Sequence, residues 1–194
     1  MKNFSAAEDF ILNNLKSGLN ANLTYHGVHH TLDVLDSAVQ IAVAEKVTSN
    51  EIALLRIGVL MHDYGFLITY KDHEEEGCRL ANEILPQFGF EKKDIEIIER
   101  MIMSTKIPQS TYTLIEKIIC DADLDYLGRD DYYSIAETLF EEMKIHSGLT
   151  DKTEWNHIQL QFLKSHHYHT AYSRMLRETN KQKRITELEK ITAA

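Results

Sequence analysis

The sequence predicts an all-α protein, and three observations support this. Apolar residues recur at helical spacing through most of the 194 residues, and no alternating strand pattern of useful length occurs. Only two prolines and eight glycines are present. The length suits one domain with a sizeable core. We therefore expect a single helical bundle over 1–194, with a motif-bearing core at about 23–130 and C-terminal helices at 150–191 packed on it.

Helix caps and apolar stripes mark the expected elements. Ser5–Glu8 and Thr48–Glu51 each have the form of a capping box, in which a hydroxyl and a carboxylate satisfy free N–H groups. Residues 25–47 carry one apolar stripe and, roughly opposite it, a second stripe that includes His26 and His30, which is typical of a central helix packed on both sides. The expected helices cover about 5–18, 25–47, 52–62, 72–86, 95–107, 114–127, 130–145, 155–163 and 171–191.

Charge and composition limit the classes of function. The formal net charge of −9 disfavours nucleic-acid polymers and anionic membranes as partners. No apolar run approaches the ~18 residues that a membrane span needs, and the N-terminus lacks the features of a signal peptide. Cys78 and Cys120 form neither a metal motif nor a disulfide framework. A reduced, cytoplasmic location is therefore expected.

An adjacent histidine and aspartate close the most apolar helix of the chain. The run 52–61 is interrupted only by Arg56 and then meets His62-Asp63. Burying an imidazole and a carboxylate is unfavourable unless something binds them. His30 and Asp123 are the candidate partners, because His30 lies on the central helix and Asp123 faces the core with Ile119.

Two imidazoles and two carboxylates make a mixed nitrogen and oxygen site. Such a site suits a divalent Mn, Fe, Zn, Ni, Co or Mg ion better than a thiophilic metal, and the identity of the ion stays open. An ion there would lower the pKa of bound water and polarise a phosphoryl oxygen.

The ordered set Tyr25-His26, His30, His62-Asp63 and Ala122-Asp123-Leu124 resembles the HD superfamily of metal-dependent phosphohydrolases. The resemblance implies an all-α fold and a metal held by His30, His62, Asp63 and Asp123. It also implies a small phosphate ester as substrate, with nucleotides or cyclic nucleotides as the leading class. The Tyr-His opening is similar to that of cyclic-nucleotide phosphodiesterases. On that likeness, His26 would protonate the leaving oxygen and act in catalysis beside Asp63.

Two rival functions stay open beside this one. Dinuclear relatives supply further histidines, and some are di-iron oxygenases. Here His73 is a candidate second-metal ligand or simply a helix N-terminal residue, and no histidine lies near Ser104. A metal- and ligand-binding regulatory module with little turnover is the other rival. Asp121 is expected to be a cap or to support a ligand rather than to bind the metal.

The sequence context of other polar residues indicates their roles less specifically. Lys71, Lys106 and Arg129 lie near the motifs in sequence and are candidates for binding phosphate. The cluster His166, His167 and His169 could close the mouth of the site or bind a metal, whereas the plainer interpretation is a helix junction with exposed imidazoles. The charged end 178–190 is expected to be a solvated face, with a homodimer contact as the alternative.

Overall fold

The computed structural model describes residues 1–193 and confirms the all-α prediction, with nine α-helices, three short 3₁₀ turns and no strand among these residues. No helix within the described chain is long and apolar enough to cross a membrane. The α-helices are α1 Phe4–Gly18, α2 Val28–Ala44, α3 Ser49–His62, α4 His73–Ile84, α5 Lys92–Thr105, α6 Leu114–Asp123, α7 Tyr132–His146, α8 Lys152–Ser165 and α9 Ala171–Thr192. The 3₁₀ turns are η1 Tyr64–Leu67, η2 Leu85–Phe88 and η3 Asp125–Gly128.

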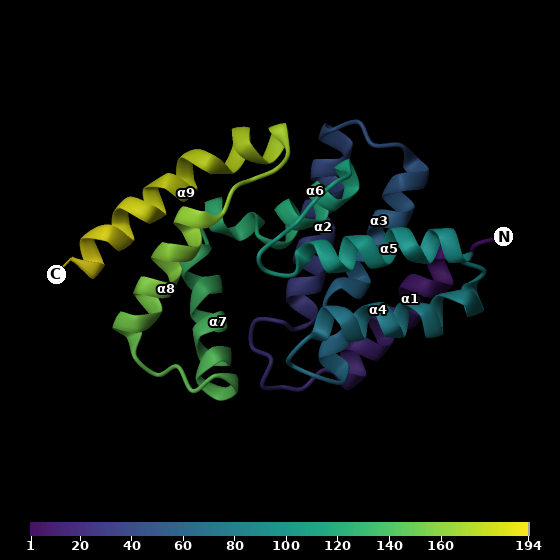
Figure 1. The fold of residues 1–194 in the computed structure, drawn as a ribbon, viewed down its shortest axis with the longest axis horizontal. Helices are drawn as coiled ribbons and strands as arrows, with labels where there is room; N and C mark the ends of the chain where they lie inside the picture. The colour runs from purple at the N-terminus through teal and green to yellow at the C-terminus, as the bar shows by residue number, and fades with distance from the viewer. Residues whose placement is uncertain (194) are drawn as a thin grey trace.

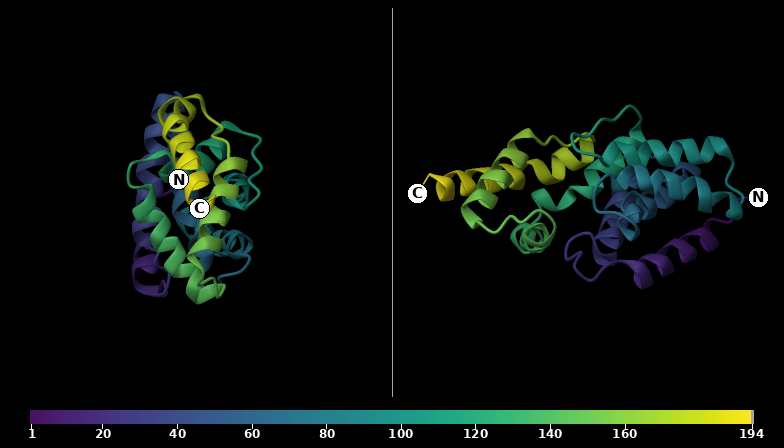
Figure 2. Two further views of the ribbon diagram at one scale, coloured as in Figure 1. Left: turned by 90° about the vertical axis from the view of Figure 1, so that its left-hand side faces the viewer. Right: turned by 60° about the horizontal axis from the view of Figure 1, so that its bottom comes forward.

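The helices gather into two groups, each with its own hydrophobic core. Helices α1 to α6 surround the first core, whereas α7, α8 and α9 lie together at the opposite end and enclose the second (Figure 1). The two chain ends lie far apart along the long axis (Figure 2). Tyr25 and Leu124 belong to the second core although they flank helices of the first. The junction between the two groups therefore carries residues from both halves of the chain.

Helix α3 lies at the centre of the first group. It contacts α1, α2, α4, α5 and α6, and its residues from Ile57 to His62 are all buried. The predicted capping box at its start is present, because Glu51 N–H donates to the Thr48 hydroxyl and Thr48 N–H donates to the Glu51 carboxylate. The other predicted box, at Ser5, is wrong. Helix α1 begins at Phe4, and the side chain of Asn3 caps it instead.

The predicted start of the central helix at residue 25 is also wrong. Helix α2 begins at Val28, after an extended Gly27. The N–H groups of Tyr25 and His26 donate to one carboxylate oxygen of Glu142, at 2.8 and 3.0 Å, rather than to helical carbonyls. This contact spans over a hundred residues of sequence and outweighs the local helical pattern. His26 thus lies before α2 begins. It does not share a helical face with His30, as the predicted helix would require.

The predicted helix over 114–127 is likewise interrupted. Helix α6 ends at Asp123, and η3 follows after a non-helical Leu124. Arg177 of α9 donates two hydrogen bonds to the Asp125 carboxylate, at 2.7 and 2.9 Å. A Cβ atom at Gly128 would lie 2.5 Å from the carbonyl oxygen of Arg177, so only glycine permits this close packing. The packing of α9 thus stabilises the turn where the pattern alone favours helix.

Gly65 has a role beyond the helix stop that its sequence position suggests. It lies within η1, and a Cβ atom there would stand 1.9 Å from the carbonyl oxygen of His73. The absence of a side chain lets the first turn of α4 pack directly on η1. This brings His73 beside Asp63, at the end of α3.

Candidate metal centre

The four predicted ligand residues lie together, although they come from three different helices and one helix end. The Nε2 atom of His30 lies 3.1 Å from Asp123 Oδ1 and 3.5 Å from Asp63 Oδ2. The Nε2 atom of His62 lies 3.2 Å from Asp63 Oδ2 and 3.6 Å from Asp123 Oδ1. One ligand atom each from His30, His62 and Asp123 lies within 4.8 Å of the others. The predicted convergence of these four side chains is therefore observed.

The donor atoms fit a divalent cation. His62 Nδ1 donates to the carbonyl oxygen of Val59 at 2.6 Å, which leaves the Nε2 lone pair directed at the carboxylates. His62 Nε2 and Asp63 Oδ2 are buried and have no hydrogen-bond partner within the described chain. Buried polar atoms are normally satisfied, so these two indicate a site built for a ligand. A mixed histidine and carboxylate set suits a first-row divalent metal.

The electrostatics of the cluster favour positive charge. Burial alone would lower the pKa of His62, but Asp63 and Asp123 outweigh it and raise that pKa well above its usual value. Burial alone would raise the pKa of Asp63 and of Asp123, yet the neighbouring imidazoles hold both pKa values well below the usual range. Both carboxylates are thus ionised at neutral pH. A metal ion would replace the protons as the source of compensating charge.

His26 lies beside this cluster and is oriented by Glu142, a residue that the sequence analysis missed. His26 Nδ1 lies 2.5 Å from Glu142 Oε1, and the Glu142 carboxylate is fully buried. The hydroxyl of Tyr70 donates to the same Oε1 atom at 3.3 Å. Burial alone would lower the pKa of His26, whereas the contact with Glu142 raises it. In the sequence, Glu142 is recognisable only as an acidic residue next to the apolar stripe of α7. That position does not indicate which residue it contacts.

His73 and Asp121 support the cluster in different ways. His73 Nε2 lies 3.5 Å from Asp63 Oδ1, so the two oxygens of Asp63 face different histidines. Asp121 is fully buried and accepts the N–H groups of His169 and Thr170, at 2.7 and 2.8 Å. Asp121 thereby ties α6 to the start of α9. The N-cap of α9 is Thr170, and both oxygens of Asp121 accept backbone N–H groups that precede this helix.

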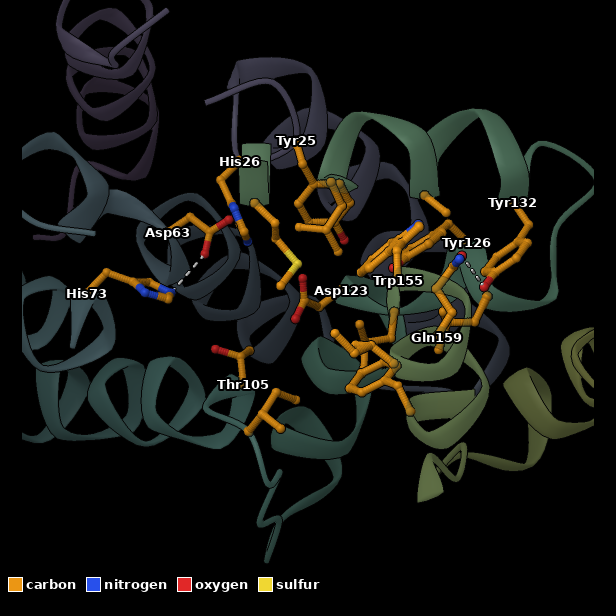
Figure 3. Close-up of a pocket in the computed structure, with 18 of the residues that line it drawn as sticks. Tyr25, His26, Asp63, His73, Thr105, Asp123, Tyr126, Tyr132, Trp155 and Gln159 are labelled. Carbon is orange, nitrogen blue, oxygen red and sulfur yellow. Dashed lines mark hydrogen bonds and ion pairs between the residues drawn. The ribbon is translucent and has the colours of Figure 1, made fainter. Parts of the chain in front are cut away.

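A cavity of about 280 Å³ opens from the cluster. Asp63, His73 and His26 lie at one end, and Tyr132 and Gln159 lie at the other (Figure 3). Its wall between these ends is mainly aliphatic and aromatic, made by Leu124, Tyr126, Leu127, Ala136, Leu139, Met143, Trp155, Ile158 and Phe162. Most of these residues come from α7 and α8. The metal cluster therefore belongs to the first group of helices, whereas the space for a bound molecule is enclosed by the second.

The three basic residues considered for phosphate binding do not line this cavity. Lys71 is exposed, and Lys106 pairs with Asp72 and Glu75. Arg129 donates to Asp33 at 2.7 and 2.8 Å and also pairs with Asp131. Local carboxylates thus engage both Lys106 and Arg129.

The histidines of 166–169 occupy the junction between α8 and α9, as the plainer interpretation expected. Their exposure differs from that expectation, because His166 is buried while His167 is exposed. Burial lowers the pKa of His166 to about 3. These histidines border a separate hollow behind Phe162 and take no part in the metal cluster.

Comparison with known proteins agrees with this arrangement. The model of the HD domain family matches residues 27–125, about half of the chain. The crystal structure of a predicted HD superfamily hydrolase from an uncultured Thermotogales bacterium is similar in fold, with a TM-score of 0.61. Its identity is 23%, over 95% of this chain and 91% of that one. No curated protein gives a significant match. Because the family model matches about half of the chain and spans His30, His62, Asp63 and Asp123, the chain belongs to the HD domain family.

Proposed function

We propose that this protein is a phosphohydrolase that uses a divalent metal ion to hydrolyse a small phosphate ester, with nucleotides or cyclic nucleotides as the leading class. The main support is that His62 Nε2 and Asp63 Oδ2 are buried without a hydrogen-bond partner, in a cluster whose residues Asp63 and Asp123 line a cavity. His30, His62, Asp63 and Asp123 would hold the ion. When bound, it would lower the pKa of water and offset negative charge on a phosphoryl group.

His26 is proposed as the general acid. A histidine that donates a proton needs a fixed ring orientation and an accessible nitrogen facing the substrate. Glu142 fixes the ring through Nδ1, which leaves Nε2 of His26 free for a leaving oxygen in the cavity that His26 lines. The ring is also stacked on Phe66, with centroids 4.4 Å apart. Glu142 is thus proposed as a positioning residue that also raises the pKa of His26.

His73 is proposed to support Asp63 rather than to hold a second ion. Its Nε2 faces Asp63 Oδ1, while Ser104 and Thr105 stand where a further histidine would be needed on α5. Ser104 donates to the carbonyl of Met101 and Thr105 to that of Ile102, so both hydroxyls bond to their own helix, and neither side chain supplies an imidazole. One ion per chain is therefore expected. With both cysteines free thiols, a reducing, cytoplasmic setting is proposed as well.

The test is an activity panel of phosphomonoesters, phosphodiesters and nucleotides, with protein reconstituted in separate Mn, Fe, Zn, Ni, Co and Mg samples. Hydrolysis by at least one metal form, with about one ion per chain by elemental analysis, would support the proposal. Full metal occupancy without turnover of any ester would instead favour a regulatory module. Two irons per chain with oxygen consumption would favour an oxygenase.

The acid role is tested with two variants and two kinds of substrate. His26→Ala should lower turnover of esters with poor leaving groups by roughly 10²–10⁴-fold and spare activated esters more, because activated leaving groups need no proton. Glu142→Gln should produce a smaller loss with the same selectivity. It should also shift the alkaline limb of the pH profile, where the general acid loses its proton, to lower pH. Glu141→Gln is the matched control, since Glu141 is exposed on the same helix. Equal losses for both kinds of ester would remove the assignment.

A further inference from the structure

The far part of the cavity, here named the apolar lobe, has a composition that restricts the substrate. Trp155, Tyr126, Tyr132 and Gln159 lie in this part of the cavity, away from His26, Asp63 and His73 (Figure 3). All the carboxylates and imidazoles that line the cavity, from Asp63, Glu74, Asp123, His26 and His73, belong to the metal end. A molecule bound through its phosphate at that end would place its leaving group in the apolar lobe.

No lysine or arginine lines the cavity within the described chain. The negative charge of a substrate can therefore be balanced only at the metal end. A second anionic group in the lobe would lose its hydration without gaining a cationic partner, which is strongly unfavourable. An uncharged, apolar leaving group would instead gain free energy from burial against these side chains.

The end of the lobe carries a polar pair that is held in a defined orientation. The hydroxyl of Tyr132 donates to Gln159 Oε1 at 2.9 Å, and Gln159 Nε2 donates to Asn156 at 3.3 Å. Both Tyr132 and Gln159 are buried. A primary amide can make about four hydrogen bonds, so one donor and one acceptor position of Gln159 stay available. The side-chain amide of Gln159 can therefore pair with an amide-like group on a ligand, which also offers one donor and one acceptor.

We propose that the substrate is a phosphate ester whose leaving group is uncharged, with an apolar body that fills the lobe and an amide-like end that Gln159 recognises. Gln159 is thereby a specificity-determining residue. This inference rests on the proposed function, because it assumes that the phosphate of the substrate binds and reacts at the metal end of the cavity. An uncharged heterocycle with an amide edge and an aliphatic chain that ends in a carboxamide both meet this description.

Primary alkyl phosphates test the body of the leaving group without changing its acidity. Along ethyl, butyl and hexyl phosphate, kcat/KM of the metal-loaded protein should rise roughly threefold to fourfold per methylene, as burial of each group in an apolar site predicts. A hexyl chain that ends in a carboxamide should react at least as well as the one that ends in methyl. The carboxylate-ended chain should be at least about tenfold poorer.

Gln159→Leu tests the polar end, because leucine keeps the volume and removes the hydrogen bonds. This variant should lose roughly tenfold in kcat/KM for the carboxamide ester, since the amide is then buried without a partner, so the carboxamide ester should become a poorer substrate than hexyl phosphate. Gln161→Leu, an exposed position on the same helix, is the matched control. Circular dichroism and metal content confirm that both variants fold.

Trp155 supplies a readout that does not depend on turnover. It is the single tryptophan of the chain, it is buried and it lines the lobe. Its emission should change on titration with hexyl phosphate or with uncharged hexanamide, and not with inorganic phosphate. Ester hydrolysis with no dependence on chain length would overturn this inference and leave the proposed function standing. A response of Trp155 to hexanamide in a protein that hydrolyses no ester would overturn the proposed function and leave the assignment of the apolar lobe standing.

Discussion

At the scale of single residues, His62 has the surroundings of a metal ligand. The bond from its Nδ1 to Val59 fixes the tautomer, and its Nε2 atom is buried, unpartnered and within 4 Å of two carboxylates. His62 Nε2 and Asp63 Oδ2 lie 3.2 Å apart without the geometry of a hydrogen bond. The arrangement is more easily explained by a cation than by internal pairing.

His62→Ala should remove the ion and the activity together, because one of four ligands is lost from a site with no spare donor. Metal content measured by elemental analysis after gel filtration is expected to fall at least tenfold. His29→Ala is the control, since His29 is exposed and adjacent to the proposed ligand His30. Retention of stoichiometric metal by the His62 variant would contradict the assignment.

The pair of His26 and Glu142 should make stability depend on pH. The pKa of His26 is raised from 6.5, so its share of the stabilisation is complete below that value and is lost as the pH rises through the folded pKa. The pKa of Glu142 is lowered from 4.5, so its share is present above that value and is lost as the pH falls through the folded pKa.

Glu142→Gln should therefore destabilise the protein most between about pH 4.5 and 6.5, and less at pH 9. Urea denaturation of metal-free wild-type and variant protein at these pH values measures the difference. Glu141→Gln, which removes an exposed carboxylate, should show no such window. A difference that is constant from pH 5 to pH 9 would mean that Glu142 acts only through its backbone contacts.

At the scale of elements, short 3₁₀ turns decide how the helices that carry the site meet. Turn η1 follows Asp63 and turn η3 follows Asp123, so each carboxylate lies where an α-helix ends and the chain changes direction. In both turns a glycine makes a backbone approach that no other residue permits, Gly65 against His73 and Gly128 against Arg177. These contacts place the carboxylates relative to α4 and α9.

Gly65→Ala should reduce the free energy of unfolding by about 1–3 kcal/mol, because its Cβ would overlap the His73 carbonyl and force α4 away from η1. Chemical denaturation measures this loss. Gly148→Ala is the contrast, because Gly148 has positive φ and open space around it and should lose only about 1 kcal/mol or less. An equal loss in both variants would show that backbone freedom, and not packing, is the important property of Gly65.

At the scale of the whole molecule, the site lies where two hydrophobic cores meet. The proposed ligands lie on α2, α3 and α6 and at the C-cap of α3, whereas Glu142 lies on α7 and much of the cavity lining lies on α7 and α8. An ion held at this junction would stabilise the folded state, in which its ligands are assembled, over the unfolded chain.

Addition of a divalent ion at about 100 times its dissociation constant should stabilise the protein by about 2.7 kcal/mol and raise its Tm. Thermal unfolding with and without a chelator measures the effect. Asp123→Asn should abolish the metal-dependent increase in Tm, whereas Asp130→Asn, at an exposed position nearby, should retain it. An increase of the same size in both variants would indicate that the ion binds elsewhere.

The helical class and the ligand set could be read from the sequence because each depends on local pattern or on residue type. Helical periodicity is visible within a few turns, and a buried His62-Asp63 pair requires partners of a few chemical kinds. The start of α2 and the break after α6 could not be read in this way. Both depend on contacts with distant residues, Glu142 and Arg177, that outweigh local propensity.

The sequence by itself therefore determined an all-α protein with two imidazoles and two carboxylates available for a metal, since these follow from composition, periodicity and the chemistry of burial. Only the tertiary structure decided that Glu142 orients His26 and that α7 and α8 enclose an apolar lobe ending at Gln159. Those features depend on how two hydrophobic cores pack against each other. Packing of this kind joins residues far apart in the chain and leaves no periodic signal in the sequence.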